Sequence, residues 1–167
     1  SMRGRYRSVP MEELIEEAVK LTAGGVKELI LVAQETTMYG VDLYGGKRLP
    51  ELLKRLAQIE AVQWIRILYC YPEEITEELA EEIRKNKKVC HYLDLPIQHC
   101  NDEILKKMGR RTYKRQLMEK IGMLRKRIPD IALRTTLISG FPGETEEQHE
   151  ECIEFVKAMR FDRLGVF

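Results

Sequence analysis

The sequence lacks several features that would place it at once in a particular class of protein. No apolar run approaches the roughly 18 residues that a membrane-spanning helix needs. The four cysteines, Cys70, Cys90, Cys100 and Cys152, show neither CxxC nor CxxxCxxC spacing. Neither sign of charge dominates, because 28 Lys and Arg face 27 Asp and Glu and leave a net charge of +1. These absences argue against a membrane protein, a disulfide framework and a generally cationic nucleic-acid binder.

The composition is that of a folded domain. Of the 167 residues, 44% are hydrophobic and 33% are charged, which supplies both a core and a solvated surface. The length fits a single domain. Cysteines without a disulfide pattern indicate a reducing compartment, so we expect a cytoplasmic protein without a signal peptide. We expect Ser1 and Met2 to be the remnant of a cleavage site that precedes the natural residues.

Short apolar runs alternate with helical patterns along the whole chain. The runs predict strands at residues 29–33, 65–69, 92–97, 132–138 and 164–167. Serial units of strand and helix, each roughly 30 to 40 residues long, indicate an α/β fold with a parallel sheet. If successive strands are neighbours, the five strands form a partial (βα) barrel with helices on its outer face. A doubly wound sheet is the alternative.

The two faces of the predicted strands differ in polarity, since successive residues of a strand point to opposite faces. One set is almost wholly apolar and is expected to face the helices. The other set is expected to point into the barrel interior and consists of Gln34, Arg66, Asp94, Gln98, Arg134 and Thr136. Asp94 is expected to pair with Arg66 or Arg134. An internal ion pair is one reading of this polar set, and a polar ligand lying across the strand ends is the other.

Polar residues and glycines also follow the predicted strands, at the edge where parallel α/β folds bind ligands. Gly140 and Gly143 precede a helix with a Thr145–Gln148 capping box, and their backbone N–H groups could approach an anion, although a simple turn explains them equally well. A soft metal site at Cys70, His99 and Cys100 lacks any supporting spacing. We therefore expect no metal ligands in this chain.

A basic segment spans residues 106–127, where ten Lys and Arg face one Glu and give a local charge of +9. The remainder of the chain then has a charge of −8. A solvated helix face is the usual explanation of such a run, and contact with RNA or a ribonucleoprotein is the alternative. The segment by itself indicates no nucleic-acid specificity.

Four segments of the sequence resemble the radical S-adenosylmethionine methylthiotransferases. They are residues 3–8, 33–44, 95–99 and 140–147, the last reading GFPGETEE. The resemblance extends over essentially the whole chain. Residues 98–99, 108–112 and 134–136 resemble the branch that modifies a small-subunit ribosomal protein more than the branch that modifies tRNA.

This resemblance implies S-adenosylmethionine and 4Fe-4S clusters as cofactors of the full-length protein. A reduced cluster would cleave the cofactor to a radical, and a methylthio group would be added to the β-carbon of an aspartate. The CxxxCxxC motif that binds the cluster in the family is expected just before Arg3 and is missing. We therefore expect residues 3–167 to be part of the core domain, without its first strand and cluster loop, and to be inactive alone.

Resemblance and strand parity together predict the cofactor-binding residues, with no catalytic residue among them: Gln34, Gln98, Arg134, Thr136 and Gly140. The Gly-Gly-Glu of the family is replaced here by Ala33-Gln34-Glu35. The expected partner is a small-subunit ribosomal protein or the ribosome, bound through the full-length protein and away from any membrane. A tRNA adenosine methylthiotransferase and a non-catalytic α/β binding module remain the alternatives.

Overall fold

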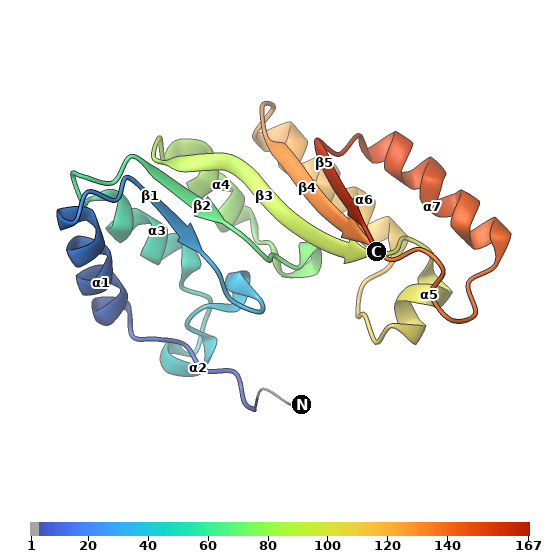
Figure 1. Ribbon diagram of the computed structural model, residues 1–167, viewed down its shortest axis with the longest axis horizontal. Coiled ribbons are helices and arrows are strands. Elements are labelled where there is room, and N and C mark those ends of the chain that lie inside the picture. The colour runs from blue at the N-terminus through green and yellow to red at the C-terminus, as the bar shows by residue number, and fades with distance from the viewer. Residues whose placement is uncertain (1–3) are drawn as a thin grey trace.

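Five parallel strands form one sheet in the order β1-β2-β3-β4-β5 (Figure 1). The computed structural model describes residues 4–167, so the remnant expected at Ser1 and Met2 lies outside the described residues. The strands are β1 (Glu28–Leu31), β2 (Trp64–Ile67), β3 (Val89–Gln98), β4 (Ala132–Leu137) and β5 (Arg163–Val166). Each strand lies beside its predecessor, which confirms a partial barrel, because a doubly wound sheet reverses its strand order.

Helices cover one side of this sheet and connect its strands (Figure 1). They are α1 (Met11–Ala23), α2 (Val41–Tyr44), α3 (Leu49–Ala57), α4 (Glu77–Lys85), α5 (Asp102–Lys107), α6 (Lys114–Arg127) and α7 (Glu146–Met159). The predicted capping box of α7 is confirmed, since Thr145 and Gln148 each accept a hydrogen bond from the other's backbone N–H. Among the described helices, none is long and apolar enough to cross a membrane.

The apolar residues on the helix-facing side of the strands form the core, as the sequence predicts. Ile65, Ile67, Leu93 and Leu133 are all fully buried between the sheet and its helices. Full burial of such a side chain contributes about 1.5–3 kcal/mol relative to its exposure. The helices and the sheet are therefore held together mainly by this one layer of aliphatic side chains.

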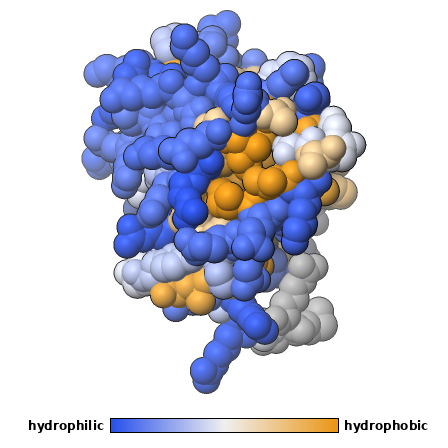
Figure 2. Space-filling view, turned by 90° about the vertical axis from the view of Figure 1, so that its left-hand side faces the viewer, coloured by the Kyte–Doolittle hydropathy of each residue, from blue (hydrophilic) through white to orange (hydrophobic). Residues whose placement is uncertain are grey.

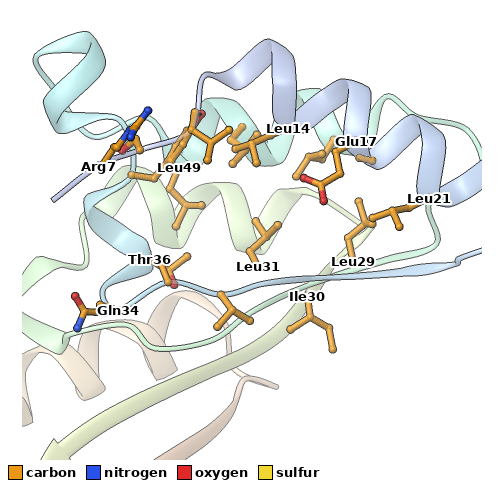
Figure 3. A pocket seen from close by; sticks show the side chains of 18 of the residues that line it. Arg7, Leu14, Glu17, Leu21, Leu29, Ile30, Leu31, Gln34, Thr36 and Leu49 are labelled. Atoms are coloured by element: carbon orange, nitrogen blue, oxygen red, sulfur yellow. Dashed lines mark hydrogen bonds between the residues drawn. The ribbon is translucent and has the colours of Figure 1, made fainter. Parts of the chain in front are cut away.

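Within residues 4–167 no helix lies over the opposite face of the sheet (Figure 1), and the polarity of this face changes from one edge to the other. On β2, β3 and β4 it holds Arg66, Asp94, Arg134 and Thr136, as predicted, whereas a register shift after Leu95 puts Gln98 opposite Leu137. On β1 the prediction is incomplete, because Ile30 occupies this face (Figure 3) and is 53% exposed, and Val32 just beyond the strand is 59% exposed. Figure 3 shows Ile30 pointing away from α1, whereas Leu29 and Leu31 point toward the helices.

The edge of the sheet at β1 is open. In the described part of the chain β1 pairs only with β2, and a groove of about 910 Å³ runs between β1, α1 and the segment before α1. Figure 2 shows an apolar, hollowed area on this side of the molecule. Unpaired strand edges next to apolar surface are normally covered in a complete fold.

Candidate functional site

An ion pair lies at the centre of the uncovered face. Arg134 on β4 and Asp94 on β3 are partners in the strand register, and Arg134 Nη1 donates to Asp94 Oδ1 at 2.6 Å. The Asp94 side chain is 3% exposed, whereas that of Arg134 is 40% exposed. The expected pairing of Asp94 is thus confirmed with Arg134. Arg66 instead pairs with Glu28, at 2.6 Å between Arg66 Nε and Glu28 Oε1.

Arg134 retains hydrogen-bonding capacity beyond this pair. Both of its hydrogen bonds come from Nη1, the second one reaching Thr136 Oγ1 at 3.4 Å. A Cβ atom on Gly165 of β5 would lie 3.8 Å from both Arg134 Nη2 and Thr136 Oγ1. Because Gly165 has no side chain, the surface above these two groups stays open. A guanidinium with unused donors beside a hydroxyl suits a carboxylate-bearing ligand.

Gln98 ends β3 in a strained conformation. Its φ is +71°, in the left-handed region that non-glycine residues rarely adopt, and Tyr69 beyond β2 has a φ of +56°. The Gln98 carbonyl accepts a hydrogen bond from Ile138 N at 2.8 Å, which links the ends of β3 and β4. Strained residues at the ends of neighbouring strands commonly mark a ligand site.

The loop at Gly140 already binds an anionic group of the protein itself, the carboxylate of Glu144. Glu144 Oε2 accepts from the backbone N–H groups of Gly140, at 2.7 Å, and Phe141, at 2.9 Å. Glu144 Oε1 lies 3.2 Å from both His99 Nε2 and His149 Nδ1. The idea that the Gly140 N–H binds an external anion is therefore wrong for this conformation. Nothing in the sequence pattern indicated that Glu144 would fill this position.

The Glu144 carboxylate is held in its charged form. Burial raises its pKa, but the hydrogen bonds from His99, Phe141, Gly140 and His149 outweigh burial, so the pKa lies below its ordinary value of 4.5. His99 is fully buried, and its Nδ1 accepts from Asn101 N at 3.0 Å. Because Nδ1 accepts a hydrogen bond, Nε2 is the ring nitrogen that donates to Glu144.

Ala33-Gln34-Glu35 leaves β1 with Gln34 exposed and Glu35 turned inward. Glu35 accepts hydrogen bonds from Thr37 N at 2.9 Å and Tyr71 N at 2.7 Å, and also from the Thr37 hydroxyl. Burial raises the pKa of Glu35. Its role is to tie the loop after β1 to the loop after β2.

The structure places three of the five expected site residues on two adjacent strands and a fourth just beyond one of them. Arg134 and Thr136 lie on β4, Gln98 ends β3, and Gly140 follows β4. Gln34 lies three residues beyond the end of β1, and β1 is three strand positions from β4, about 14 Å along the sheet. Gln34 and Arg134 can contact one ligand only if that ligand spans the mouth of the partial barrel.

A cavity of about 620 Å³ lies at the same edge, and the sequence reasoning missed its principal side chain. Arg110 lies with its guanidinium 4.2 Å above the ring of Tyr71 and donates from Nη2 to the Pro96 carbonyl at 3.1 Å. Among the described residues no partner meets the buried Arg110 Nε. In the sequence, Arg110 is recognisable only as part of the motif at residues 108–112. No periodicity in the sequence indicates that its guanidinium lies over the ring of Tyr71.

The cysteines do not form a cluster site on the uncovered face. Cys70, Cys100 and Cys152 are buried, and Cys90 is half-buried on β3. In the described chain, Cys152 rather than Cys70 joins His99 and Cys100 in the one group with ligand atoms close together. The polar residues of β3 and β4 thus fit a zwitterionic ligand, whereas the cysteines do not fit a 4Fe-4S cluster.

We expect anaerobic reconstitution of this chain with iron and sulfide to yield no stoichiometric cluster. The reason is that at most two of its cysteines share a site, while such a cluster takes three or four thiolates. Iron and acid-labile sulfide analysis with the visible absorption spectrum measures the outcome. A one-to-one cluster that any single Cys→Ser substitution removes would contradict the expectation.

The fold and this polar strand edge place the chain in a known class. The model of the radical SAM superfamily matches residues 1–156, so the chain belongs to that superfamily. Among solved structures, the radical S-adenosylmethionine methyltransferase TsrM from Kitasatospora setae superposes with a TM-score of 0.70 at 18% identity, covering 94% of this chain and 30% of that one. SuiB from Streptococcus suis gives 0.68 at 14% identity, covering 98% and 34%. These two likenesses show the fold.

Curated relatives are far more similar in sequence. A protein of Lachnoclostridium phytofermentans described as "Ribosomal protein uS12 methylthiotransferase RimO" is 66% identical over 166 residues, which is 99% of this chain and 38% of the relative. A protein of the same description from Clostridium acetobutylicum is 57% identical, over 99% of this chain and 37% of the relative. The chain thus spans a little over a third of the length of these relatives.

Proposed function

We propose that this chain is the central part of the radical SAM core of a methylthiotransferase that modifies ribosomal protein uS12, at the β-carbon of an aspartate. The observation that supports this most is the 66% identity to a relative described as a uS12 methylthiotransferase, over 99% of the chain. The activity, the ribosomal partner and a cytoplasmic location are proposed for the longer protein. The chain alone is proposed to be inactive.

The domain boundary is part of this proposal. Residues 3–167 would belong to the core domain, and a preceding strand with the CxxxCxxC loop would complete the barrel beside β1. Two features support it: among residues 4–167 β1 pairs on one side only, and apolar residues of β1 and α1 line part of the groove beside it. The exposed Ile30 and Val32 would then be covered.

When bound, S-adenosylmethionine with a reduced 4Fe-4S cluster supplies the radical chemistry. The residues of this chain would bind and orient the cofactor. Arg134 would receive its carboxylate through the donors not engaged by Asp94, and Thr136 and Gln98 would meet its hydroxyl or amine groups. The Asp94 carboxylate fixes the position of the guanidinium, and Gln34 would contact the end of the cofactor nearer β1.

Binding of S-adenosylmethionine by this chain is expected to be weak, because the cluster that would chelate its amine and carboxylate is absent. Arg134→Lys is expected to remove this weak binding while leaving a cation beside Asp94, since lysine lacks the planar fork of donors. Titration calorimetry measures it. Arg66→Lys is the matched control, because Arg66 lies on the same face and is paired with Glu28. Equal binding by the two variants would contradict the assignment of Arg134.

The function is tested in a bacterium deleted for the full-length gene. We expect the aspartate of ribosomal protein uS12 to lose its methylthio group in mass spectra, and the methylthio-adenosine of bulk tRNA to stay intact. Loss of the tRNA modification alone would favour the tRNA enzyme. Loss of neither would favour a non-catalytic module. Complementation by the full-length gene but not by its Arg134→Lys variant would connect the activity to the proposed site.

A further inference from the structure

Two cysteines far apart in the sequence meet on the helix side of the sheet. Cys100 lies two residues beyond the end of β3, and Cys152 lies in the middle of α7. They are 0% and 6% exposed. Together with His99, their ligand atoms all lie within 4.8 Å of one another. Neither thiol belongs to the polar site on the uncovered face, so the proposed function does not use them.

A metal ion would need a nitrogen of His99, and both are engaged. Nδ1 accepts from Asn101 N at 3.0 Å, and Nε2 lies 3.2 Å from Glu144 Oε1. A metal bond to either nitrogen would break one of these interactions in a residue that is fully buried, which costs the desolvation of the group left unpaired. The two thiols alone can react with one another without disturbing His99.

The two thiols are not equivalent. Cys100 Sγ lies 3.6 Å from the carbonyl oxygen of Glu151, the neighbour of Cys152 on α7. The hydrogen bond between the thiols lowers the pKa of Cys152. The same hydrogen bond, together with burial, raises the pKa of Cys100. Cys152 is therefore the thiol that ionises first, and the thiolate is the nucleophilic form.

Of the two cysteines, it is Cys152 that lines a pocket that a small molecule could enter. Cys152 contributes to the wall of a pocket of about 220 Å³ between α7 and the helix-facing side of β5, whose walls include His149, Leu164 and Val166. In the 167-residue chain Leu164 and Val166 are 43% and 57% exposed, and the pocket is open to solvent there. Cys100 does not line it. A small reagent that enters this pocket meets Cys152 before it meets Cys100.

We propose that Cys152 and Cys100 are a reactive thiol pair that takes low-molecular-weight disulfides as oxidant and closes to an intramolecular disulfide. The Cys152 thiolate attacks one sulfur of the disulfide RSSR, forming a Cys152–S–S–R bond and releasing RS⁻. Cys100 then gives up its proton to RS⁻ and attacks Cys152 Sγ, displacing the second RS⁻. The two protein thiols are oxidised, and the reagent is reduced to two thiols.

The test uses the 167-residue chain with 2-hydroxyethyl disulfide as the probe, under anaerobic conditions and with metal removed by a chelator. We expect two of the four thiols to disappear on titration in denaturant. Peptide mapping after alkylation should find Cys100 linked to Cys152. In Cys100→Ser, a mixed disulfide should accumulate on Cys152, whereas in Cys152→Ser none should form on Cys100 at a comparable rate. Cys90→Ser is the matched control and should retain the cross-link.

Three results would overturn the proposal. All four thiols of the unmodified chain could stay reduced at equilibrium with the probe, a measurement that needs no variant to fold. Cys100 could form the mixed disulfide as fast in Cys152→Ser as Cys152 does in Cys100→Ser. Finally, the chain could bind zinc one-to-one through both thiols, which Cys100→Ser and Cys152→Ser would each abolish, and the cluster would then be a metal site.

Discussion

Replacing Arg134 with alanine is expected to lower the free energy of unfolding by about 3 kcal/mol. The substitution leaves the Asp94 carboxylate, whose side chain is 3% exposed, without the cation that lies 2.6 Å from it. Removing one partner of a buried ion pair typically costs about 3–5 kcal/mol, and the 40% exposure of Arg134 places this pair at the low end. Urea denaturation followed by circular dichroism measures the change.

Arg66→Ala is the matched control for this experiment. Arg66 lies on the same face of the sheet and also meets its carboxylate, that of Glu28, at 2.6 Å, but Glu28 is 34% exposed. Water can solvate Glu28 after the substitution, so we expect the free energy of unfolding to fall by about 1 kcal/mol or less. Equal losses for Arg134→Ala and Arg66→Ala would show that the burial of Asp94 does not matter.

Asp94→Asn should lower the free energy of unfolding less than Arg134→Ala does, and the difference should be about 1–2 kcal/mol. The amide leaves no buried charge, and the half-exposed Arg134 can turn to solvent. The double variant Asp94→Asn/Arg134→Ala should therefore be more stable than the sum of the two single losses implies. Strict additivity would mean that the two side chains do not interact in solution.

Glu144→Gln is expected to lower the free energy of unfolding by about 2–3 kcal/mol. Four donors converge on this carboxylate, whose side chain is 4% exposed, and hydrogen bonds to a charged group contribute about 1.5–3 kcal/mol each to stability. The amide nitrogen of glutamine would face N–H groups and could accept from none of them. Glu150→Gln, an exposed position on α7, is the control and should leave stability unchanged.

The same residue predicts a pH dependence. Because the pKa of Glu144 is lower in the folded protein than its ordinary value of 4.5, its contribution is fully present above pH 4.5. The contribution is lost as the pH falls below 4.5 and through the folded pKa. The difference in stability between the natural chain and Glu144→Gln should therefore shrink on acidification. A difference that stays constant from pH 7 to pH 3 would contradict this assignment.

The sequence already determined the fold class and the two faces of the sheet. The alternation of apolar and polar residues on the strands is a local property, because side chains of successive strand residues point to opposite faces. It predicted that Leu93 and Leu133 face the helices and that Asp94 and Arg134 share the other face, and it limited the partner of Asp94 to two arginines. Long motifs such as GFPGETEE then identified the family.

Tertiary structure decided how those residues are used. Strand register, which depends on packing across the whole sheet, chose Arg134 over Arg66 as the partner of Asp94. The geometry of the loop lets the Gly140 N–H donate a hydrogen bond to Glu144, although the sequence shows only a glycine turn before a capped helix. The meeting of Cys100 and Cys152 depends on how α7 packs against the segment that follows β3, across 52 positions of sequence. Local patterns fix which face a residue occupies, whereas its partners follow from long-range packing, which no short segment of sequence encodes.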